Sequence, residues 1–299
     1  MRIYTIIVTY NAMQWIDRCL ISLRNSSIKT DVIVIDNCST DGTSEYIPRN
    51  YPEVIWIPQK SNLGFGQGNN VGIRYALEHG ADYVLLLNQD ASLEKNALSL
   101  MLNASDGTNL VTPLMLNGTG TKVDESFKWS IRDVGVDIFV STIVNGVLPE
   151  KCFIGEACAA CWFMPISIIK KIGGFNPLFV QYGEDCNFYR RMVYHGMRNI
   201  FVPNAIMYHD REFKGNMKVY KNKILRRYIL VIVSDINLSK FKCVLKTLRL
   251  LATCYVHDLP RRNYKPGTFI LDICWILCHI RSILNSRKKE KILGCNWLY

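Results

Sequence analysis

Asn88-Gln89-Asp90 is the segment of this chain whose residue types best suit a cation. It directly follows the apolar run Val84 to Leu87, which is typical of a buried strand, so the Asp90 carboxylate is expected at a fixed strand end. A carboxylate beside an amide oxygen suits Mg²⁺ or Mn²⁺, hard cations that complete their shell with water and a diphosphate. On this triplet alone, a metal site and an N-cap at Asp90 for a helix beginning near Leu93 are equally favoured.

Two further groups could work with such a cation. His209 follows a predicted strand at Ile200 and would supply a third ligand, although a single histidine is more often structural. Glu184-Asp185 opens a predicted helix, where the helix dipole favours acidic residues in any case. The same carboxylates could also take a proton from a hydroxyl group.

Polar residues also follow another apolar run, Val32 to Ile35. Asp36, Asn37 and Asp41 could accept hydrogen bonds from a nucleotide base or a ribose hydroxyl. Capping and turn formation explain such a cluster more often, and Asp36 is harder to explain as a cap than Asp41.

A glycine-rich segment, Gly64 to Gly68, precedes a helix predicted over Val71 to Glu78. Its backbone N–H groups could approach a phosphate, or it could be a plain flexible loop. Because it does not follow the first strand, an NAD site is disfavoured. The flanking Asn62, Asn69 and Asn70 make the loop more polar than flexibility alone requires.

The elements that position these residues alternate as strand and helix from Ile3 to Leu87. Strands are predicted at Ile3–Thr9, Val32–Ile35, Val54–Ile57 and Tyr83–Leu87. This βαβαβαβ order predicts an α/β fold with a mostly parallel sheet, helices on both faces, and ligands at the carboxyl ends of the strands.

The region after the fourth strand is predicted to have a less regular structure. Residues 103–153 are expected to form long loops with short strands, and Gly155 to Met164 a strand. Helices are predicted over Ile166 to Ile172, closed by Gly173-Gly174, and over Glu184 to His195, followed by Gly196. A boundary is placed near residue 212.

Charge is divided unevenly along the 299 residues, which are 49% hydrophobic with a formal net charge of +11. Residues 1–210 hold 17 basic and 20 acidic side chains, and residues 211–299 hold 19 and 5. A globular body with a separate basic module for an anionic surface follows from this split. The 11 scattered cysteines predict reduced thiols in a cytosolic protein, and Cys158 and Cys161 lack the further ligands of a zinc site.

Taken in order, six motifs resemble those of inverting family 2 glycosyltransferases with the GT-A fold, in particular the rhamnosyltransferase-like branch. The resemblance covers about residues 3–210 and implies a nucleotide-sugar donor, a divalent cation (Mn²⁺ or Mg²⁺) and direct displacement at the anomeric carbon. The motifs are Ile6 to Asn11, Val34 to Gly42, Asn62 to Asn70, Leu85 to Asp90, Gly173 to Pro177 and Tyr182 to Asp185.

The resemblance also implies a role for each site residue. Asp185 would be the general base, with Glu184 its neighbour and less favoured substitute. Asn88, Asp90 and His209 would hold the metal, Asn88 also contacting the diphosphate. The remaining donor-binding residues would be Thr9, Asp36, Asn37, Asp41, Asn62, Gly66 and Asn69. The family often has a second acid two positions after the base, where this chain has Asn187.

The expected organisation is a catalytic domain over 1–212, with a nucleotide-sugar half (1–100) and an acceptor half (101–212), and a basic amphipathic helical module over 213–299. Basic and apolar residues at spacings of three and four in that module favour docking on an anionic membrane surface, over a solvated basic face. Its longest apolar stretch, Thr268 to Ile280, is too short to span a bilayer.

The function predicted is transfer of a sugar, rhamnose by preference, to a lipid-linked glycan in bacterial surface polysaccharide synthesis, at the inner face of the cell membrane. A sugar nucleotidyltransferase is one alternative, but it would need a Gly-rich signature and a Lys after the first strand, where this chain has Asn11. A non-catalytic module that binds nucleotide-sugar or nucleic acid is another. Aromatic residues for base stacking are sparse in the basic module, so no nucleic-acid partner is predicted.

Overall fold

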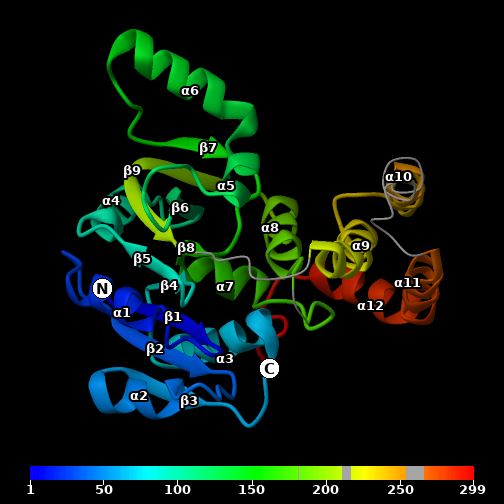
Figure 1. Cartoon of the computed structure of the whole chain (residues 1–299). Coiled ribbons are helices and arrows are strands. Elements are labelled where there is room, and N and C mark those ends of the chain that lie inside the picture. The colour runs from blue at the N-terminus through cyan, green and yellow to red at the C-terminus, as the bar shows by residue number, and fades with distance from the viewer. Residues whose placement is uncertain (181, 211–216, 254–265) are drawn as a thin grey trace.

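A nine-stranded sheet forms the centre of the molecule, in the strand order β3-β2-β1-β4-β8-β6-β9-β5, with β7 beside β9. The computed structural model describes residues 1–180, 182–210, 217–253 and 266–299 (Figure 1).

The N-terminal part of the sheet is parallel, as predicted. Its strands are β1 (Ile3–Thr9), β2 (Asp31–Asp36), β3 (Ile55–Pro58) and β4 (Tyr83–Leu87). Apolar side chains on both faces of β1 and β2 are buried, because α1 (Ile16–Arg24) and α2 (Thr43–Asn50) cover one face and α3 (Gly64–Glu78) covers the other. The α/β fold class is therefore confirmed, and the polar ends of β1, β2 and β4 lie at one edge.

The second half of the sheet is mixed. β8 (Cys161–Pro165) runs antiparallel between β4 and β6 (Leu110–Asn117), and β9 (Asn199–His209) pairs parallel to β6. The edge strands β5 (Ala91–Leu93) and β7 (Cys152–Ile154) run antiparallel to β9. Helix α4 (Ala97–Ala104) packs on β9, and α7 (Ile166–Ile172) and α8 (Glu184–Tyr194) add to the same core as α3.

Residues 103–153 differ from the prediction of long loops, because besides β6 they contain α5 (Glu125–Ser130) and α6 (Arg132–Asn145). Helix α6 projects away from the sheet (Figure 1) and exposes Ile143 and Val144. Its sequence is rich in β-branched residues and contains Gly135, both poor helix formers, so the pattern carried no helical signal.

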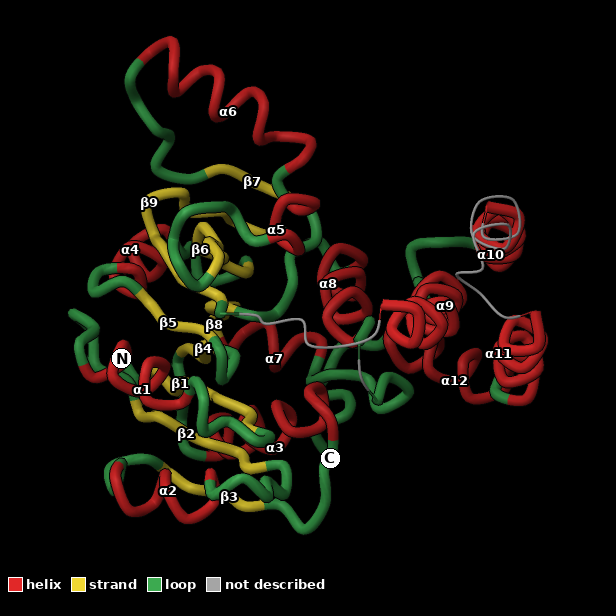
Figure 2. Tube along the Cα trace, viewed as in Figure 1, coloured by secondary structure: helices red, strands yellow, loops and turns green. Residues whose placement is uncertain are grey.

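Beyond residue 210 the described part of the chain contains the helices α9 (Met217–Ser234), α10 (Lys240–Thr253), α11 (Pro266–Cys278) and α12 (Ile280–Glu290). Figure 2 shows α9 nearest to α8, with α10 and α11 farther from the sheet. These helices share an apolar core that includes Phe179, Leu225, Ile229 and Ile283. No helix among the described residues has the length and apolar character needed to cross a membrane.

The last residues of the chain pack against α3 and the end of α7. Leu298 is 2% exposed and belongs to the core between α3 and the sheet. The backbone N–H of Gly174 donates to the Asn296 carbonyl at 2.8 Å, and a Cβ atom on Gly173 would collide with the backbone of Asn296. The Gly173-Gly174 pair therefore does more than end α7, because it gives residues 296–298 room to dock. The boundary near residue 212 stays a prediction, although α12 and the residues after it contact residues on the N-terminal side of that boundary.

Candidate active site

A cleft of about 510 Å³ lies at the carboxyl ends of β1, β2 and β4. Three polar loops and the beginning of α3 surround it, as the alternating pattern predicted. The lining residues are Val8, Tyr10, Asn37, Asn62, Gly64, Phe65, Asn88, Gln89, Asp90 and Val180.

Asp36 is the buried anchor of the loop after β2. Its carboxylate accepts hydrogen bonds from the hydroxyls of Thr9, at 3.0 Å, and Ser44, at 2.7 Å, and also from Ser39. Both Thr9 and Asp36 are at most 1% exposed, and neither lines the cleft. They hold the cleft wall in place, and their direct contact with base and ribose stays a prediction.

Asp41 and Gln89 fasten neighbouring loops together. Asp41 accepts from the backbone N–H groups of Thr43 and Met13, both at 3.1 Å, which ties the loop after β1 to the start of α2. Gln89, whose role the sequence did not reveal, exchanges two hydrogen bonds with the backbone of Tyr10 at 2.7 and 3.2 Å. The capping interpretation of Asp41 is thus satisfied, and its contribution to the nucleotide pocket stays a prediction.

The glycine-rich segment is helical, so the prediction of a loop from Asn62 to Asn70 is wrong after residue 63. Helix α3 begins at Gly64, and its glycines serve close packing. A Cβ atom on Gly68 would lie 2.8 Å from Val8, and one on Gly72 would lie 2.5 Å from Ile6. Only glycine allows α3 to lie this close to β1.

Other predicted donor residues lie at or inside the start of this helix. Asn37 donates to the Gly64 carbonyl at 3.2 Å, and Asn62 accepts from the Gly64 N–H at 2.8 Å. Gly66 packs against Phe175 and Glu184, and Asn69 is buried with its amide oxygen unbonded. Asn37 and Asn62 line the cleft, whereas Gly66 and Asn69 do not.

The three predicted metal ligands come together. His209 Nε2 lies 3.4 Å from Asp90 Oδ1 and 3.4 Å from Asn88 Nδ2. Asp90 is not a helix cap, since β5 follows it and α4 begins only at Ala97. Asn88 Oδ1 is buried without a hydrogen-bond partner, and a rotation of its amide would turn this oxygen toward His209. The donor set of carboxylate, amide oxygen and imidazole fits a divalent cation.

Asp124 supports His209 from behind. One carboxylate oxygen caps α5 by accepting from the N–H groups of Ser126 and Phe127, and the other lies 3.3 Å from His209 Nδ1. This last contact is an ion pair and not a well-directed hydrogen bond. Burial alone would lower the pKa of His209, but Asp124 and Asp90 outweigh it and raise the pKa to about 9. The sequence around Asp124 carried only a capping signal, so this partner was missed.

Charged and sulfur ligands alone do not form a metal site in the part of the chain that is described. No group of three or more His, Cys, Asp or Glu residues there could hold a metal ion, so the Asn88 amide is needed to complete the set. The ten described cysteines, Cys158 and Cys161 among them, are free thiols.

Glu184 and Asp185 occupy different environments at the start of α8. Glu184 is 5% exposed and lies against Gly66, and one of its carboxyl oxygens has no hydrogen-bond partner. Burial and the neighbouring Asp185 raise the pKa of Glu184 to about 8. Asp185 is half-buried and accepts from the N–H of Cys186 at 2.8 Å.

Comparison with known proteins relates this part of the chain to a protein family. The model described as "Glycosyl transferase family 2" matches residues 4–143. Over these residues the chain is similar to the family 2 glycosyltransferases. The match covers Asn88, Asp90, Asp124 and every residue that lines the cleft except Val180, whereas Glu184, Asp185 and His209 lie beyond it.

Curated relatives extend over different parts of the chain. "Low-salt glycan biosynthesis hexosyltransferase Agl10" of Haloferax volcanii is 27% identical over 165 residues, which are 53% of this chain and 52% of that protein. The chain thus spans about half the length of that relative. "N-acetylglucosaminyl-diphospho-decaprenol L-rhamnosyltransferase" of Mycobacterium tuberculosis is 23% identical, over 68% of this chain and 74% of the relative.

A solved structure shares the fold of the glycosyltransferase domain and its extension. "Mannosyltransferase PcManGT from Pyrobaculum calidifontis in complex with GDP-Man and Mn2+" aligns with a TM-score of 0.60 at 14% identity, over 97% of this chain and 84% of that one. At this identity the likeness is one of fold, and it confirms the predicted GT-A architecture.

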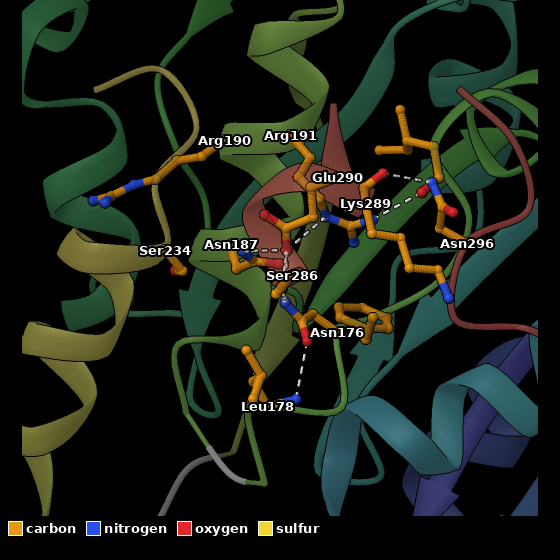
Figure 3. A network of polar contacts seen from close by, with 12 residues as sticks. Asn176, Leu178, Asn187, Arg190, Arg191, Ser234, Ser286, Lys289, Glu290 and Asn296 are labelled. Atoms are coloured by element: carbon orange, nitrogen blue, oxygen red, sulfur yellow. Dashed lines mark hydrogen bonds and ion pairs between the residues drawn. The ribbon is translucent and has the colours of Figure 1, made fainter. Parts of the chain in front are cut away.

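Helix α8 and the segment before it are joined to α12 by a buried polar network (Figure 3). The carboxylate of Glu290 accepts from Asn176, at 2.6 Å, and from Asn187, at 3.0 Å, and Arg191 Nε lies 4.0 Å away. Asn187 is the position where the family often has an acid. In this chain Asn187 faces the Glu290 carboxylate, and a second carboxylate at this buried place would be repelled by it.

Proposed function

We propose that this protein is an inverting glycosyltransferase that moves a sugar from a nucleotide diphosphate donor to a hydroxyl group of a glycan acceptor. The observation that carries the proposal is the cleft at the ends of β1, β2 and β4, with Asn88 and Asp90 in its wall and His209 behind them. The family 2 match over residues 4–143 supports a nucleotide-sugar as its occupant.

Asn88, Asp90 and His209 would hold Mn²⁺ or Mg²⁺ in this proposal. When bound, such a cation neutralises charge that develops on a leaving diphosphate. The chain's own part is orientation: Asp124 fixes the His209 ring through Nδ1, so that Nε2 faces Asp90. Loss of the proton from Nε2 must accompany metal binding, since an imidazole ligates only when that nitrogen is free.

Asp185 is the proposed general base, which takes the proton from the acceptor hydroxyl. Of the two carboxyl groups at the start of α8, Glu184 holds its proton up to about pH 8 and is not free to take another at neutral pH. A single displacement on the face of the sugar opposite the diphosphate inverts the anomeric configuration. Asp36 and Thr9 act earlier, by fixing the wall that receives the base and ribose.

Rhamnose from a dTDP donor and a lipid-linked acceptor are the proposed substrates, in bacterial surface polysaccharide synthesis. The Mycobacterium tuberculosis relative is named for both a rhamnosyl group and a decaprenol-linked acceptor, which supports this choice over other sugars. We further propose that the protein works at the cytoplasmic face of the cell membrane, where the basic helices α9 to α12 meet anionic lipid.

Donor turnover tests the proposal. The purified protein would be incubated with UDP-, dTDP- and GDP-sugars, with Mn²⁺ or Mg²⁺ and again with EDTA, and release of nucleoside diphosphate would be followed. Metal-dependent release from one donor is expected and names the sugar. Release of pyrophosphate from a nucleoside triphosphate plus a sugar phosphate would instead indicate a nucleotidyltransferase. No turnover and no thermal shift with any nucleotide would overturn the glycosyltransferase assignment.

A further inference from the structure

An apolar groove of about 480 Å³ lies between α9, α10, α11 and α12. Residues of α10 at helical spacing form one wall, including Cys243, Val244 and Leu248. Ile276 and Leu277 of α11 also line the groove. Val244, Leu248 and Leu277 are each more than half exposed, so the groove opens on the surface of the molecule. A contiguous apolar surface that is exposed to solvent and bordered by polar residues commonly marks a binding site.

A second cavity, of about 430 Å³, adjoins this groove and is basic. The two share Lys240, Leu284 and Arg287 in their walls. Arg287 is committed to the fold, because its guanidinium donates to the carbonyls of Val233, Asp235 and Leu238. The remaining cations of the basic cavity are exposed: Lys240, Arg281, Lys288 and Lys291.

Different faces of helix α12 line the apolar groove and the basic cavity. Ser286 and Glu290 point into the catalytic half, Ile280 and Ile283 line the apolar groove, and Arg281 and Lys288, seven positions apart, line the basic cavity. No acidic side chain is among the described residues that line either cavity. An occupant of both therefore needs a hydrocarbon portion joined to an anionic group.

We propose that the two cavities form one binding site for an anionic phospholipid of the membrane, with its phosphate among Lys240, Arg281 and Lys288 and part of an acyl chain in the groove. Charge complementarity favours this occupant, because an apolar helix of a partner protein would leave the basic cavity empty. The site goes beyond adsorption of basic helices to a membrane, since it takes a single lipid and is saturable. It does not depend on sugar transfer.

Calorimetric titration of the full chain with dihexanoyl phosphatidylglycerol, a soluble short-chain lipid, tests the site. Saturable binding is expected, much tighter than to dihexanoyl phosphatidylcholine or to inorganic phosphate. Arg281→Gln with Lys288→Gln should weaken it by up to about thirtyfold, since each exposed ion pair with the phosphate contributes up to about 1 kcal/mol. The matched control removes two charges outside both cavities, Lys242→Gln with Lys246→Gln, and should leave the affinity unchanged.

The groove is tested by a pair of neighbouring exposed residues on α10. Val244→Trp fills the groove and should abolish binding of the short-chain lipid, whereas Leu245→Trp, at a residue that does not line it, should not. Both side chains are about half exposed, so neither change should disturb folding, which a melting curve checks.

Several results would overturn the proposal. Equal weakening by both charge pairs, or binding to phosphatidylglycerol vesicles without binding to the soluble lipid, would indicate adsorption to the membrane surface only. If inorganic phosphate bound as tightly as the lipid, the cavity would be a simple anion site and not a lipid site. Farnesyl phosphate bound more tightly than the phospholipid would assign the site to an isoprenoid lipid. None of these measurements follows sugar transfer. A negative result for lipid binding is therefore distinguishable from a negative result for the proposed enzyme activity.

Discussion

Asn187 donates a hydrogen bond of 3.0 Å to the carboxylate of Glu290, 103 residues further along the chain. Both side chains are buried, and they join the helix that begins with Glu184 and Asp185 to the last helix of the extension. The C-terminal helices are thereby coupled to the element that carries the proposed base.

Asn187→Asp should lower the free energy of unfolding by about 3 kcal/mol, because it sets a second carboxylate against Glu290 in a buried site. Glu290→Gln in the same protein should restore most of the loss, since the glutamine amide can donate to the carboxylate introduced on α8. Urea denaturation of the wild type, both single variants and the double variant gives the coupling energy. Independent effects of the two changes would show that the contact contributes nothing.

Leu298→Ala tests the docking of the last residues on the glycosyltransferase half. The side chain is 2% exposed beside α3, so its truncation should cost about 2 to 4 kcal/mol of stability. Leu293, which is 56% exposed, is the matched control, and its change to alanine should cost less than about 0.5 kcal/mol. Similar losses for both would mean that residues 296–298 do not pack into this core.

Local pattern predicted the parallel half of the fold well, because each strand from Ile3 to Leu87 is a continuous apolar run with polar residues at its end. Local pattern failed to predict helices whose formation depends on tertiary packing. Gly64 to Gly68 looks like a loop by composition, yet it is the first part of α3, and Gly68 is needed there because β1 lies too close for a larger side chain. Helix α6 was missed because its β-branched residues give no helical signal.

The candidate site was predicted as far as its residues follow strand ends. Asn88, Asp90 and His209 were identified and do come together. Asp124 and Glu290 were not, because their importance comes from contacts with residues 85 and 103 positions away, His209 and Asn187. A single sequence does not record such pairs, and only the fold brings them together.

Glu184→Gln should change how stability depends on pH. The native state raises the pKa of Glu184 from its usual 4.5 to about 8, so between these values the folded protein keeps a proton that the unfolded chain releases. Wild-type stability contributed by this group therefore falls as pH rises through the window. Relative to wild type, the variant should gain about 4 kcal/mol between pH 5 and pH 8. Glu125→Gln, at an exposed glutamate, should show no such gain in denaturation curves.

Asp185→Asn should lower the turnover number by at least about a hundredfold while donor affinity stays the same, because only proton transfer is removed. Glu156→Gln is the control, since this carboxylate lies near α8 but pairs with Arg190 at 3.5 Å. Steady-state kinetics and nucleotide titration separate the two effects. Full turnover by Asp185→Asn together with loss in Glu184→Gln would move the base to Glu184.

Asp124→Asn separates the support of His209 from the capping of α5. Asparagine is as good an N-cap as aspartate, so α5 should keep its start, while the negative charge behind His209 Nδ1 is lost. Carboxylates that orient a ligating histidine typically contribute 10- to 100-fold in metal affinity. Mn²⁺ binding, followed by electron paramagnetic resonance without donor or acceptor, should weaken by about that factor.

The control for this change is Asp106→Asn, which removes an equal charge from a loop outside the cleft. It should leave Mn²⁺ affinity as in wild type, and His209→Ala should lower it further than Asp124→Asn does. Because the raised pKa of His209 depends on Asp124, the Asp124→Asn change should also make the imidazole easier to deprotonate. Weakened Mn²⁺ binding in spite of this opposing effect would assign Asp124 to orientation of the ring, whereas unchanged or tighter binding would limit it to capping α5.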